Sequence, residues 1–233
     1  MENTIVSFQN VSKRYQLKEA VRHLSFDLPT GMVIGLIGPN GSGKTTTLKL
    51  MTGLLHPNDG QVLFQNKRIN RMMARQVSYL SDTGAVYGFY TVRQMVNYYA
   101  GIYADFNVAK ATEMLTFMQL DGNQRVRTLS KGNLGRLKIV LAVSRQVPLI
   151  VMDEPLSGLD PLVRQSILKG LISFIDLENQ TVVLSTHEVD EVEPLLDMAV
   201  LLNHGEVSAM DYTDHIRETF GGSIVEWMKQ VLV

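Results

Sequence analysis

The sequence predicts an α/β protein in which a mainly parallel sheet is flanked by helices. Three observations support this class: short apolar runs typical of buried strands recur along the chain, segments with helical spacing alternate with them, and a glycine-rich turn links one such run to a helix. The chain has 233 residues, 45% of them hydrophobic, which is enough to bury a substantial core. We therefore expect one compact domain, or a domain with a subdomain.

The first part of the chain is expected to be rich in strands. Strand-like segments cover 4–8, 20–28 and 32–37, a helix is expected over 44–51, and further strand patterns cover 61–64 and 77–80. The pattern then changes, because 91–120 has the spacing of helices. This region predicts a helical insert, followed by an amphipathic helix over 134–146.

Strand and helix alternate again in the last part of the chain. Strands are expected over 149–152, 181–185 and 198–202, and helices over 161–177 and 189–196. This alternation is typical of a parallel sheet covered by helices. Helical spacing returns over 212–233 and is interrupted at Gly221 and Gly222, which we expect to end one short helix and begin another.

A glycine-rich turn directly after the apolar run 32–37 fits the pattern G-x-x-x-x-G-K-[ST]. Its small residues let backbone N–H groups converge, and the start of a helix adds partial positive charge, so the turn suits phosphate oxygens. We expect Lys44 to neutralise the β and γ phosphates and the Thr45 hydroxyl to bind Mg²⁺. A glycine turn without ligand is the alternative. The expected nucleotide-binding residues here are Gly38, Asn40, Gly41, Ser42, Gly43, Lys44, Thr45 and Thr46.

A second chemical feature is the apolar run 149–152, which ends in Asp153, Glu154 and Pro155. Ligands of open α/β sheets gather at the carboxyl ends of strands. As the last residue of a neighbouring strand, Asp153 is expected to reach Mg²⁺ directly or through water. Glu154 is expected to hold a water in line with the γ-phosphate and to act as its base. A solvated acidic strand end, stopped by Pro155, is the alternative.

Composition narrows the range of functions. The formal net charge is −1 and the basic residues are scattered, so nucleic acid is not an expected partner. The first residues carry no basic stretch leading into an apolar one, and the longest apolar runs fall short of the roughly 18 residues of a membrane span, so we do not expect the chain to enter a membrane unaided. The absence of cysteine excludes disulfides and thiolate metal sites and is compatible with a reducing cytoplasm.

Three further motifs make a family resemblance specific. Leu129, Ser130, Lys131, Gly132 and Asn133 precede the acidic strand and resemble LSGGQ, the signature of the nucleotide-binding subunit of ATP-binding-cassette (ABC) transporters. The sequence Ser157-Gly158-Leu159-Asp160 resembles the D-loop of that family, and His187, within Ser185-Thr186-His187-Glu188, resembles its switch histidine. Tyr15 stands where the family has an aromatic residue that stacks on adenine. The motifs follow one another in the order of the family and cover nearly the whole chain.

The resemblance implies a P-loop NTPase core with a mainly parallel sheet, an N-terminal antiparallel β subdomain and an inserted α-helical subdomain. It implies a single ABC ATPase domain over 1–233. Within it, about 1–86 and 147–211 form the core with the β subdomain, about 87–146 the helical subdomain, and 212–233 a helical tail. The tail's pattern does not decide whether it braces a dimer or packs on its own domain.

The resemblance also implies a mechanism with ATP and Mg²⁺. Glu154, His187 and Lys44 are the expected catalytic residues, and one copy cannot close its own site. A second ATPase subunit, identical or homologous, would pair head to tail and present Ser130 and Gly132 to the γ-phosphate. A separate transmembrane permease subunit would hold the pair at the inner face of the cell membrane, and the power would drive export of an antibiotic, an amphipathic peptide or a lipid.

Several of these residues have simpler alternative roles. Ser130 is also well placed to cap the following helix, and both roles are compatible. For His187 taken alone, the alternative is a solvated or structurally bonded histidine. For Tyr15, the alternative is a core residue of a strand. The insert carries aromatic residues that would form a cleft for a coupling helix of the permease or would simply be helix core: Tyr87, Phe89, Tyr90, Tyr98, Tyr99 and Tyr103.

The sequence departs from the family pattern at two places. Asp82 stands where the family usually has a glutamine that touches Mg²⁺ or its water, and an aspartate is shorter, charged and unable to donate an amide hydrogen bond. Asp82 is therefore a third candidate metal ligand, and the Mg²⁺ dependence is expected to differ from the norm. Lys131 and Asn133 replace glycine and glutamine of the signature, and the lysine resembles a branch of bacterial exporters (ABC-2 type) that includes bacitracin-type resistance ATPases.

Three other classes of function remain as alternatives. A soluble ABC ATPase of translation or DNA repair lacks a membrane partner, but such translation factors usually carry two cassettes in one chain. A nucleotide-gated binding module with little hydrolysis is suggested only by Asp82, and Glu154 and His187 argue against it. An unrelated P-loop enzyme, such as a small-molecule kinase, would leave the signature segment and the D-loop unexplained.

Overall fold

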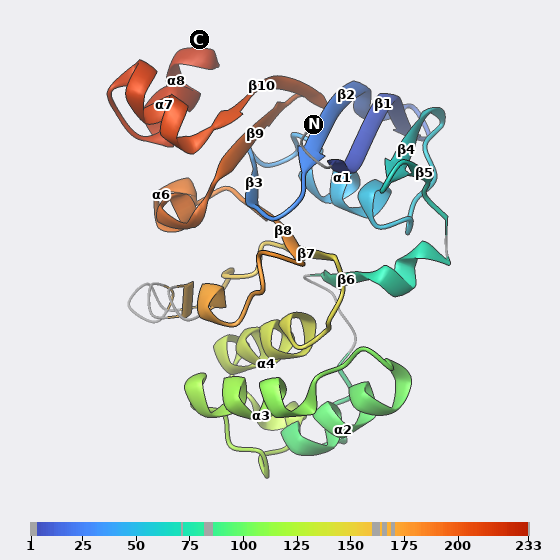
Figure 1. Ribbon diagram of the computed structural model, residues 1–233, viewed down its shortest axis with the longest axis vertical. Coiled ribbons are helices and arrows are strands. Elements are labelled where there is room, and N and C mark those ends of the chain that lie inside the picture. The colour runs from blue at the N-terminus through green and yellow to red at the C-terminus, as the bar shows by residue number, and fades with distance from the viewer. Residues whose placement is uncertain are drawn as a thin grey trace.

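The structure is a computed structural model, and it describes residues 4–70, 72–81, 86–159, 164, 167–168 and 171–232. In Figure 1 an antiparallel sheet and the C-terminal helices lie at the top, and the helices α2 (Val92–Ile102), α3 (Val108–Phe117) and α4 (Lys131–Val143) lie at the bottom. Two residues singled out in the sequence, Asp82 and Asp160, lie outside the described residues.

The N-terminal part forms the antiparallel sheet, as predicted. Its strands are β1 (Thr4–Tyr15), β2 (Lys18–Pro29), β4 (Asp59–Phe64) and β5 (Lys67–Arg68), in the order β2-β1-β4-β5. The first two strands are longer than the expected 4–8 and 20–28. Their pairing shifts register between Phe8 and Val11, where Asn10 has a left-handed backbone with φ of 52°. A bulge of this kind breaks the alternation of buried and exposed residues on which the prediction rests.

The second sheet has six strands in the order β10-β9-β3-β8-β7-β6. They are β3 (Val33–Ile37), β6 (Val77–Leu80), β7 (Leu149–Asp153), β8 (Thr181–Thr186), β9 (Met198–Asn203) and β10 (Glu206–Tyr212), all parallel to their neighbours except β10. The sequence did not predict β10, an edge strand whose residues are exposed or half-buried. One expectation is corrected: β7 is not adjacent to the strand of the glycine turn, because β8 lies between them.

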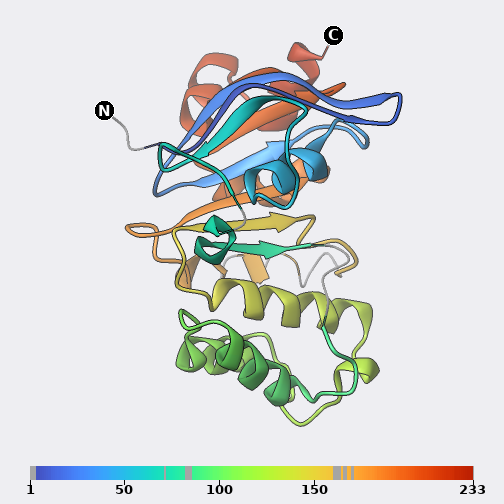
Figure 2. The same cartoon turned by 90° about the vertical axis from the view of Figure 1, so that its right-hand side faces the viewer.

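The central strands are buried on both faces, which explains their continuous apolar runs. Leu149 and Val151 of β7 face the core shared with α1 (Lys44–Met51) and the antiparallel sheet, whereas Ile150 and Met152 face the helices. Figure 2 shows α4 lying between the strands β6 and β7 and the helices α2 and α3. The six-stranded sheet therefore forms the rigid middle layer of the molecule.

Side-chain caps begin each helix of the insert. Thr91 and Gln94 form a capping box at α2, and Asn107 caps α3. The helix expected over 134–146 begins at Lys131, because Ser130 Oγ accepts a hydrogen bond from the Asn133 N–H at 3.2 Å. A short 3-10 turn, η2 (Val126–Thr128), precedes this cap.

Arg145 joins the helical part to the sheet. It is 4% exposed, forms an ion pair with Asp105, and its guanidinium lies 3.8 Å from the centre of the Tyr103 ring. The same guanidinium donates to the carbonyl of Arg75 at 2.7 Å, in the 3-10 turn η1 (Met73–Gln76) that leads into β6. A buried arginine with several hydrogen bonds of this kind fixes the position of one layer against the other.

The tail packs on its own domain, which the sequence left open. Its helices α7 (Thr213–Phe220) and α8 (Ile224–Val231) are separated at Gly221, whose φ of 64° ends α7 as expected. Ile224 and Trp227 are buried in the same hydrophobic core as Ile150 and Met152 of β7. The Ile224 N–H donates to Glu193 Oε2 at 3.0 Å, in the 3-10 turn η3 (Glu193–Leu195).

The segments before the tail differ in part from prediction. The helix expected over 189–196 is a short α6 (Val189–Val192) continued by η3, which contains Pro194. A proline lacks the N–H that a continuing α-helix requires. Of the helix expected over 161–177, the described residues Arg164, Ile167, Leu168 and 171–173 are helical, whereas 174–177 are not.

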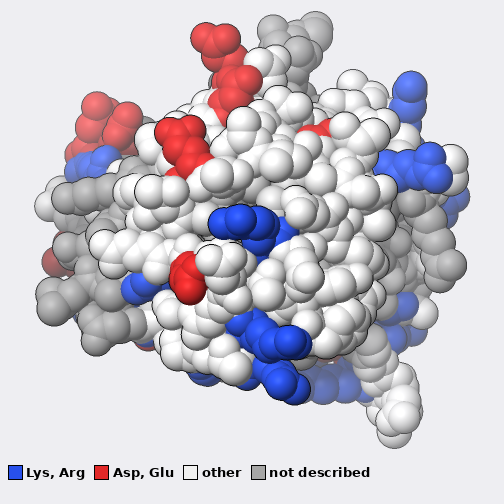
Figure 3. All heavy atoms as spheres, turned by 90° about the horizontal axis from the view of Figure 1, so that it is seen from below, with Lys and Arg blue, Asp and Glu red and all other residues white. Residues whose placement is uncertain are grey.

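The helical end has a net positive charge in a chain that is nearly neutral overall. Residues 87–146 contain eight Lys or Arg and three Asp or Glu. Seen from below, this end shows basic side chains separated by uncharged surface, with some acidic side chains in the same view (Figure 3). Within the described residues, no helix is both long and apolar enough to span a bilayer.

The packing of the tail generates a stability prediction. Trp227→Ala removes a side chain that is 2% exposed, so it is expected to lower the free energy of unfolding by about 3–5 kcal/mol. Lys229→Ala, at an exposed position of the same helix, is the matched control and should change it by less than about 0.5 kcal/mol. Urea unfolding followed by circular dichroism measures both. Tryptophan fluorescence cannot be used, because Trp227 is the only tryptophan and the variant lacks it. Equal midpoints for Trp227→Ala and wild type would show that the tail is not part of the cooperative unit.

Candidate functional site

The glycine turn joins β3 to α1 and leaves no room for side chains at two positions. Gly38 has a φ of 144°, and a Cβ there would lie 2.1 Å from the carbonyl oxygen of Leu202. Gly43 has a φ of 105°, and its Cβ would lie 2.7 Å from the carbonyl oxygen of Ala20 in β2. Both contacts are with backbone, which cannot move aside cheaply. The turn is therefore held between β9 and β2 in a conformation that requires glycine.

The interior of the turn contains a polar atom without a partner. The Ser42 hydroxyl is buried and has no hydrogen-bond partner within the described chain. Buried hydroxyls are normally satisfied, and this one lies in the glycine turn directly before the start of α1. Asn40, Gly41 and Thr45 are exposed, and Thr46 is half-buried. The turn thus fits an oxyanion such as the phosphate predicted from the sequence.

Lys44 extends from α1 back over the turn. Its ammonium donates to the carbonyl of Gly38 at 2.8 Å and to that of Pro39 at 3.2 Å. It also lies 3.9 Å from Glu154 Oε1. Burial lowers the pKa of Lys44, and the charges of Glu154 and Asp153 act in the opposite direction. The two carboxylates thus help to keep a buried ammonium charged beside the turn.

Asp153, at the end of β7, accepts hydrogen bonds from three hydroxyl groups. Its Oδ1 accepts from Ser185 Oγ at 2.7 Å and from Thr45 Oγ1 at 3.2 Å, and its Oδ2 accepts from the Tyr79 hydroxyl at 3.4 Å. Asp153 is 4% exposed. Burial, with the charge and hydrogen bond of Asp153, raises the pKa of Tyr79, so its phenol stays protonated and donates. Thr45 and Asp153 thus present adjacent oxygen atoms, the donors that Mg²⁺ prefers.

Glu154 has an unusual backbone that directs its side chain. Its φ is 47°, in the left-handed region that non-glycine residues adopt at a cost of about 1–3 kcal/mol. The Glu154 N–H donates to Ser185 Oγ at 3.0 Å, which helps to hold this conformation. Glu154 Oε2 lies 3.0 Å from His187 Nδ1, and His187, just after β8, is 43% exposed. The structure therefore brings together the three residues expected to be catalytic, Lys44, Glu154 and His187.

Sequence reasoning did not assign two residues of this site. Ser185 lies within the histidine motif, which predicts no role for it, yet it bonds both Asp153 and the Glu154 backbone. Its position opposite Asp153 in the β7–β8 register was not available from the sequence pattern. Tyr79 reaches Asp153 from β6, on the other side of β7, and no motif points to it.

Two other predicted residues stay exposed. Tyr15 ends β1 and is 45% exposed, so the alternative interpretation of Tyr15 as a core residue is wrong. Ser130 caps α4, which confirms the capping alternative, and the first turn of α4 has no acidic residue to offset its partial positive charge. Gly132 is half-buried and packs beside Leu159.

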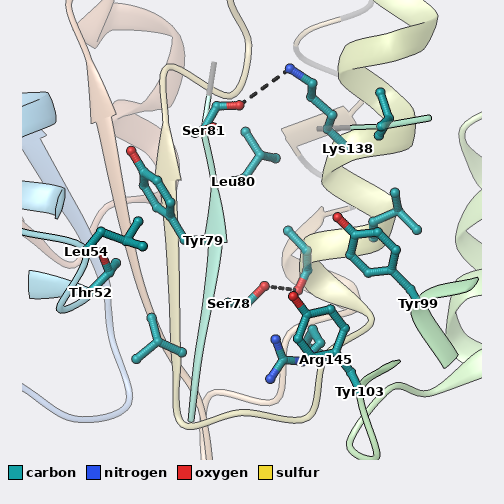
Figure 4. Close-up of a pocket in the computed structure, with 14 residues that line it drawn as sticks. Thr52, Leu54, Ser78, Tyr79, Leu80, Ser81, Tyr99, Tyr103, Lys138 and Arg145 are labelled. Atoms are coloured by element: carbon teal, nitrogen blue, oxygen red, sulfur yellow. Dashed lines mark hydrogen bonds between the residues drawn. The ribbon is translucent and has the colours of Figure 1, made fainter. Parts of the chain in front are cut away.

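A groove of about 280 Å³ follows the edge strand β6. Figure 4 shows Tyr99, Tyr103 and Arg145 on its helical side and Thr52 and Leu54 on the other. The aromatic residues of the insert differ in their exposure. Tyr87 and Phe89 are exposed, whereas Tyr90, Tyr98, Tyr99 and Tyr103 are half-buried against the core.

Comparison with known proteins gives the same assignment. The family model described as "ABC transporter" matches residues 21–157. The Nod factor export ATP-binding protein I of Burkholderia orbicola is 33% identical over 208 residues, covering 86% of this chain and 68% of that protein. The solved structure titled "Structure of ATP binding subunit of ABC transporter" has a TM-score of 0.86 and 27% identity, and covers 99% of this chain and 100% of its own.

A second solved structure is the dimeric ATP-binding cassette MJ0796, bound to ADP and Pi in a post-hydrolysis state. It has a TM-score of 0.79 and 23% identity over 89% of this chain and 98% of its own, and shows that the fold is shared. The family model spans more than half of the 233 residues, and its match includes the glycine turn and both carboxylates. The chain therefore belongs to the ABC transporter family, as one of its ATP-binding and ATP-hydrolysing domains.

Proposed function

We propose that this chain powers a membrane exporter by pairing head to tail with a second ATPase subunit around ATP. The observation that carries the proposal is the separation of two half-sites. Lys44, Glu154 and His187 converge beside the glycine turn, whereas Ser130 is exposed at the start of α4 and contacts none of these three side chains in the described structure. The export function of the Burkholderia relative supports the direction of transport.

The turn and Lys44 bind the phosphates in this proposal. The N–H groups of the turn and the Ser42 hydroxyl receive phosphate oxygens, and the Lys44 ammonium exchanges its carbonyl contacts for the β and γ phosphates. Tyr15 stacks on adenine. Thr45 and Asp153 hold Mg²⁺, which neutralises charge on the phosphates, and Asp82 is a further candidate ligand outside the described residues.

Glu154 and His187 carry out the hydrolytic step. Glu154 orients a water toward the γ-phosphorus and accepts its proton. His187, 3.0 Å from Glu154, senses the γ-phosphate and holds the Glu154 carboxylate toward it. The left-handed backbone of Glu154 keeps the base fixed before substrate arrives, which lowers the reorganisation that the reaction requires.

The signature segment completes the site of the second subunit. The N-terminus of α4, a helix of 13 residues, presents backbone N–H groups, the Ser130 hydroxyl and Gly132 to the γ-phosphate bound by the partner. ATP then bridges two surfaces, and loss of the γ-phosphate separates them. The dimeric state of MJ0796 with ADP and Pi supports this arrangement.

The groove along β6 receives a cytoplasmic helix of a separate permease. Its aromatic lining suits an apolar helix face, and the excess of basic residues in the insert favours acidic residues on that helix. Binding there places the chain at the inner face of the cell membrane. The cargo is bound by the permease.

The hydrolytic role is tested by Glu154→Gln. The amide is nearly isosteric but cannot accept the proton, so kcat should fall by about 10²–10⁴-fold while ATP binding persists and a dimer accumulates. Phosphate release measures kcat. Glu178→Gln, at an exposed position, is the matched control and should hydrolyse ATP like wild type. Normal turnover by Glu154→Gln would remove Glu154 from the role of base.

Phosphate binding is tested by Lys44→Ala. Loss of charge-assisted hydrogen bonds should weaken ATP binding by roughly tenfold or more, as measured by calorimetric titration. Lys49→Ala, one turn further along the same helix, controls for the lost positive charge and should bind with nearly wild-type affinity. An unchanged affinity in Lys44→Ala would contradict the assignment of the turn.

The pairing is tested by Ser130→Arg in the Glu154→Gln background. A bulky arginine at the signature should block ATP-driven dimerisation but spare ATP binding to the monomer, and size-exclusion chromatography with ATP separates the two species. Ser223→Arg removes the equivalent cap of α8 at a similar cost of about 1 kcal/mol and should still dimerise. A full dimer peak for Ser130→Arg would rule out the sandwich.

A further inference from the structure

Arg164 connects two segments that flank the nucleotide site. Its Nε donates to the carbonyl of Leu159 at 2.8 Å, in the segment that resembles the D-loop. Its NH1 group donates to Glu188 Oε2 and, at 2.8 Å, to both carboxylate oxygens of Glu191. Only arginine among the side chains offers donors in a planar fork that can satisfy a carbonyl and carboxylates together.

The environment of Arg164 makes this contact a specific one. The Arg164 side chain is 12% exposed, and that of Glu191 is 26% exposed, so solvent screens the pair only in part. The hydrogen bond with Glu191 raises the pKa of the Arg164 guanidinium, which stays charged. Multiply bonded arginines with shielded partners fix geometry better than surface ion pairs do.

One end of this connection lies beside the catalytic pair. Glu188 directly follows His187, and its N–H donates to Thr186 Oγ1 at 2.9 Å, at the end of β8. Glu191 belongs to α6, the short helix that begins just after Glu188. The position of His187 against Glu154 therefore depends on how this segment is held.

The other end lies beside the signature helix. A Cβ built on Gly132 would lie 3.5 Å from Leu159 Cδ2, and one built on Gly158 would lie 2.7 Å from Lys131 Cε. The Gly158–Leu159 segment thus packs against the start of α4 on one side and is bonded by Arg164 on the other. A shift of α4 would reach this segment directly.

We propose that Arg164 is a positioning residue that sets the place of His187 relative to Glu154 and ties it to the Gly158–Leu159 segment. The inference rests on the proposed ATPase mechanism and adds a residue to it. In the paired state, contacts made at the signature helix and at the D-loop would reach the switch histidine through one guanidinium. Hydrolysis in one site would thereby depend on how the subunit is seated on its partner.

The test is a double-mutant cycle between Arg164 and His187 in the full chain. Arg164→Met keeps the length of the side chain and removes its charge and donors. It should lower the single-turnover rate, and with it kcat, by about tenfold or more, because small misplacements of reacting groups cost this much, and should leave the Kd for ATP within about twofold. In a His187→Ala background the same change should lower the single-turnover rate by less than about twofold, since the group through which it acts is gone.

Two further variants separate positioning from folding. Arg217→Met removes an exposed arginine, paired with Asp214 on α7, and should match wild type in every measurement. Arg164→Lys keeps the charge but cannot hold the Leu159 carbonyl and both carboxylates together, so it should recover only part of the lost kcat. Arg164→Lys also serves as the test variant if Arg164→Met fails to fold, as judged by thermal melting.

The outcomes distinguish the inference from the proposed function. An equal loss of rate in the wild-type and His187→Ala backgrounds would overturn the positioning role, as would full kcat in Arg164→Met or full recovery by Arg164→Lys. A fall of ATP affinity in parallel with kcat would also overturn it, because it indicates a general loss of structure. A wild-type chain without ATPase activity would instead refute the proposed function itself.

Discussion

The hydroxyl group of Ser185 organises the acidic end of the site. It donates to Asp153 and accepts the N–H of Glu154, so one buried atom fixes the Asp153 carboxylate and the Glu154 backbone at the end of β7. This contact exists because β7 and β8 pair in a register that sets Asp153 opposite Ser185. A slip of one residue would turn each side chain to the other face of the sheet. The burial of these strands on both faces makes such a slip costly. The packing of the core therefore also fixes the geometry of the site.

The same sheet supports parts that serve different purposes. Its carboxyl edge holds the phosphate turn, the acids and His187, whereas its edge strand β6 borders the aromatic groove of the helical insert. Tyr79 belongs to both, since it lines the groove and its hydroxyl reaches Asp153. Arg145 fixes the insert to the layer that carries these residues. Rigid elements thus position loops that contact ligands and partners, the usual division of labour in α/β enzymes.

The site contains both local backbone strain and an unsatisfied polar atom. Glu154 has a left-handed backbone, and the Ser42 hydroxyl is buried without a partner in the described chain. Phosphate binding or the catalytic step can offset both free-energy costs. Both residues lie within loops braced by strands. Arg164 extends this bracing to the histidine segment and to the segment beside the signature helix. A small number of hydrogen bonds therefore fixes the groups of the site, so the loss of one bond is expected to affect several groups.

The sequence by itself determined the class of fold, the order of its motifs and most of the residues around the phosphate turn. These features are local: a glycine turn needs small residues, a buried parallel strand needs a continuous apolar run, and Ser130 caps a helix within its own segment. Only the tertiary structure decided the length of β1, the edge strand β10, the place of β8 between β3 and β7, and the packing of Trp227. It alone brought Ser185, Tyr79 and Arg164 to the site, because strand register and layer packing join residues far apart in the chain and leave no periodic trace in the sequence.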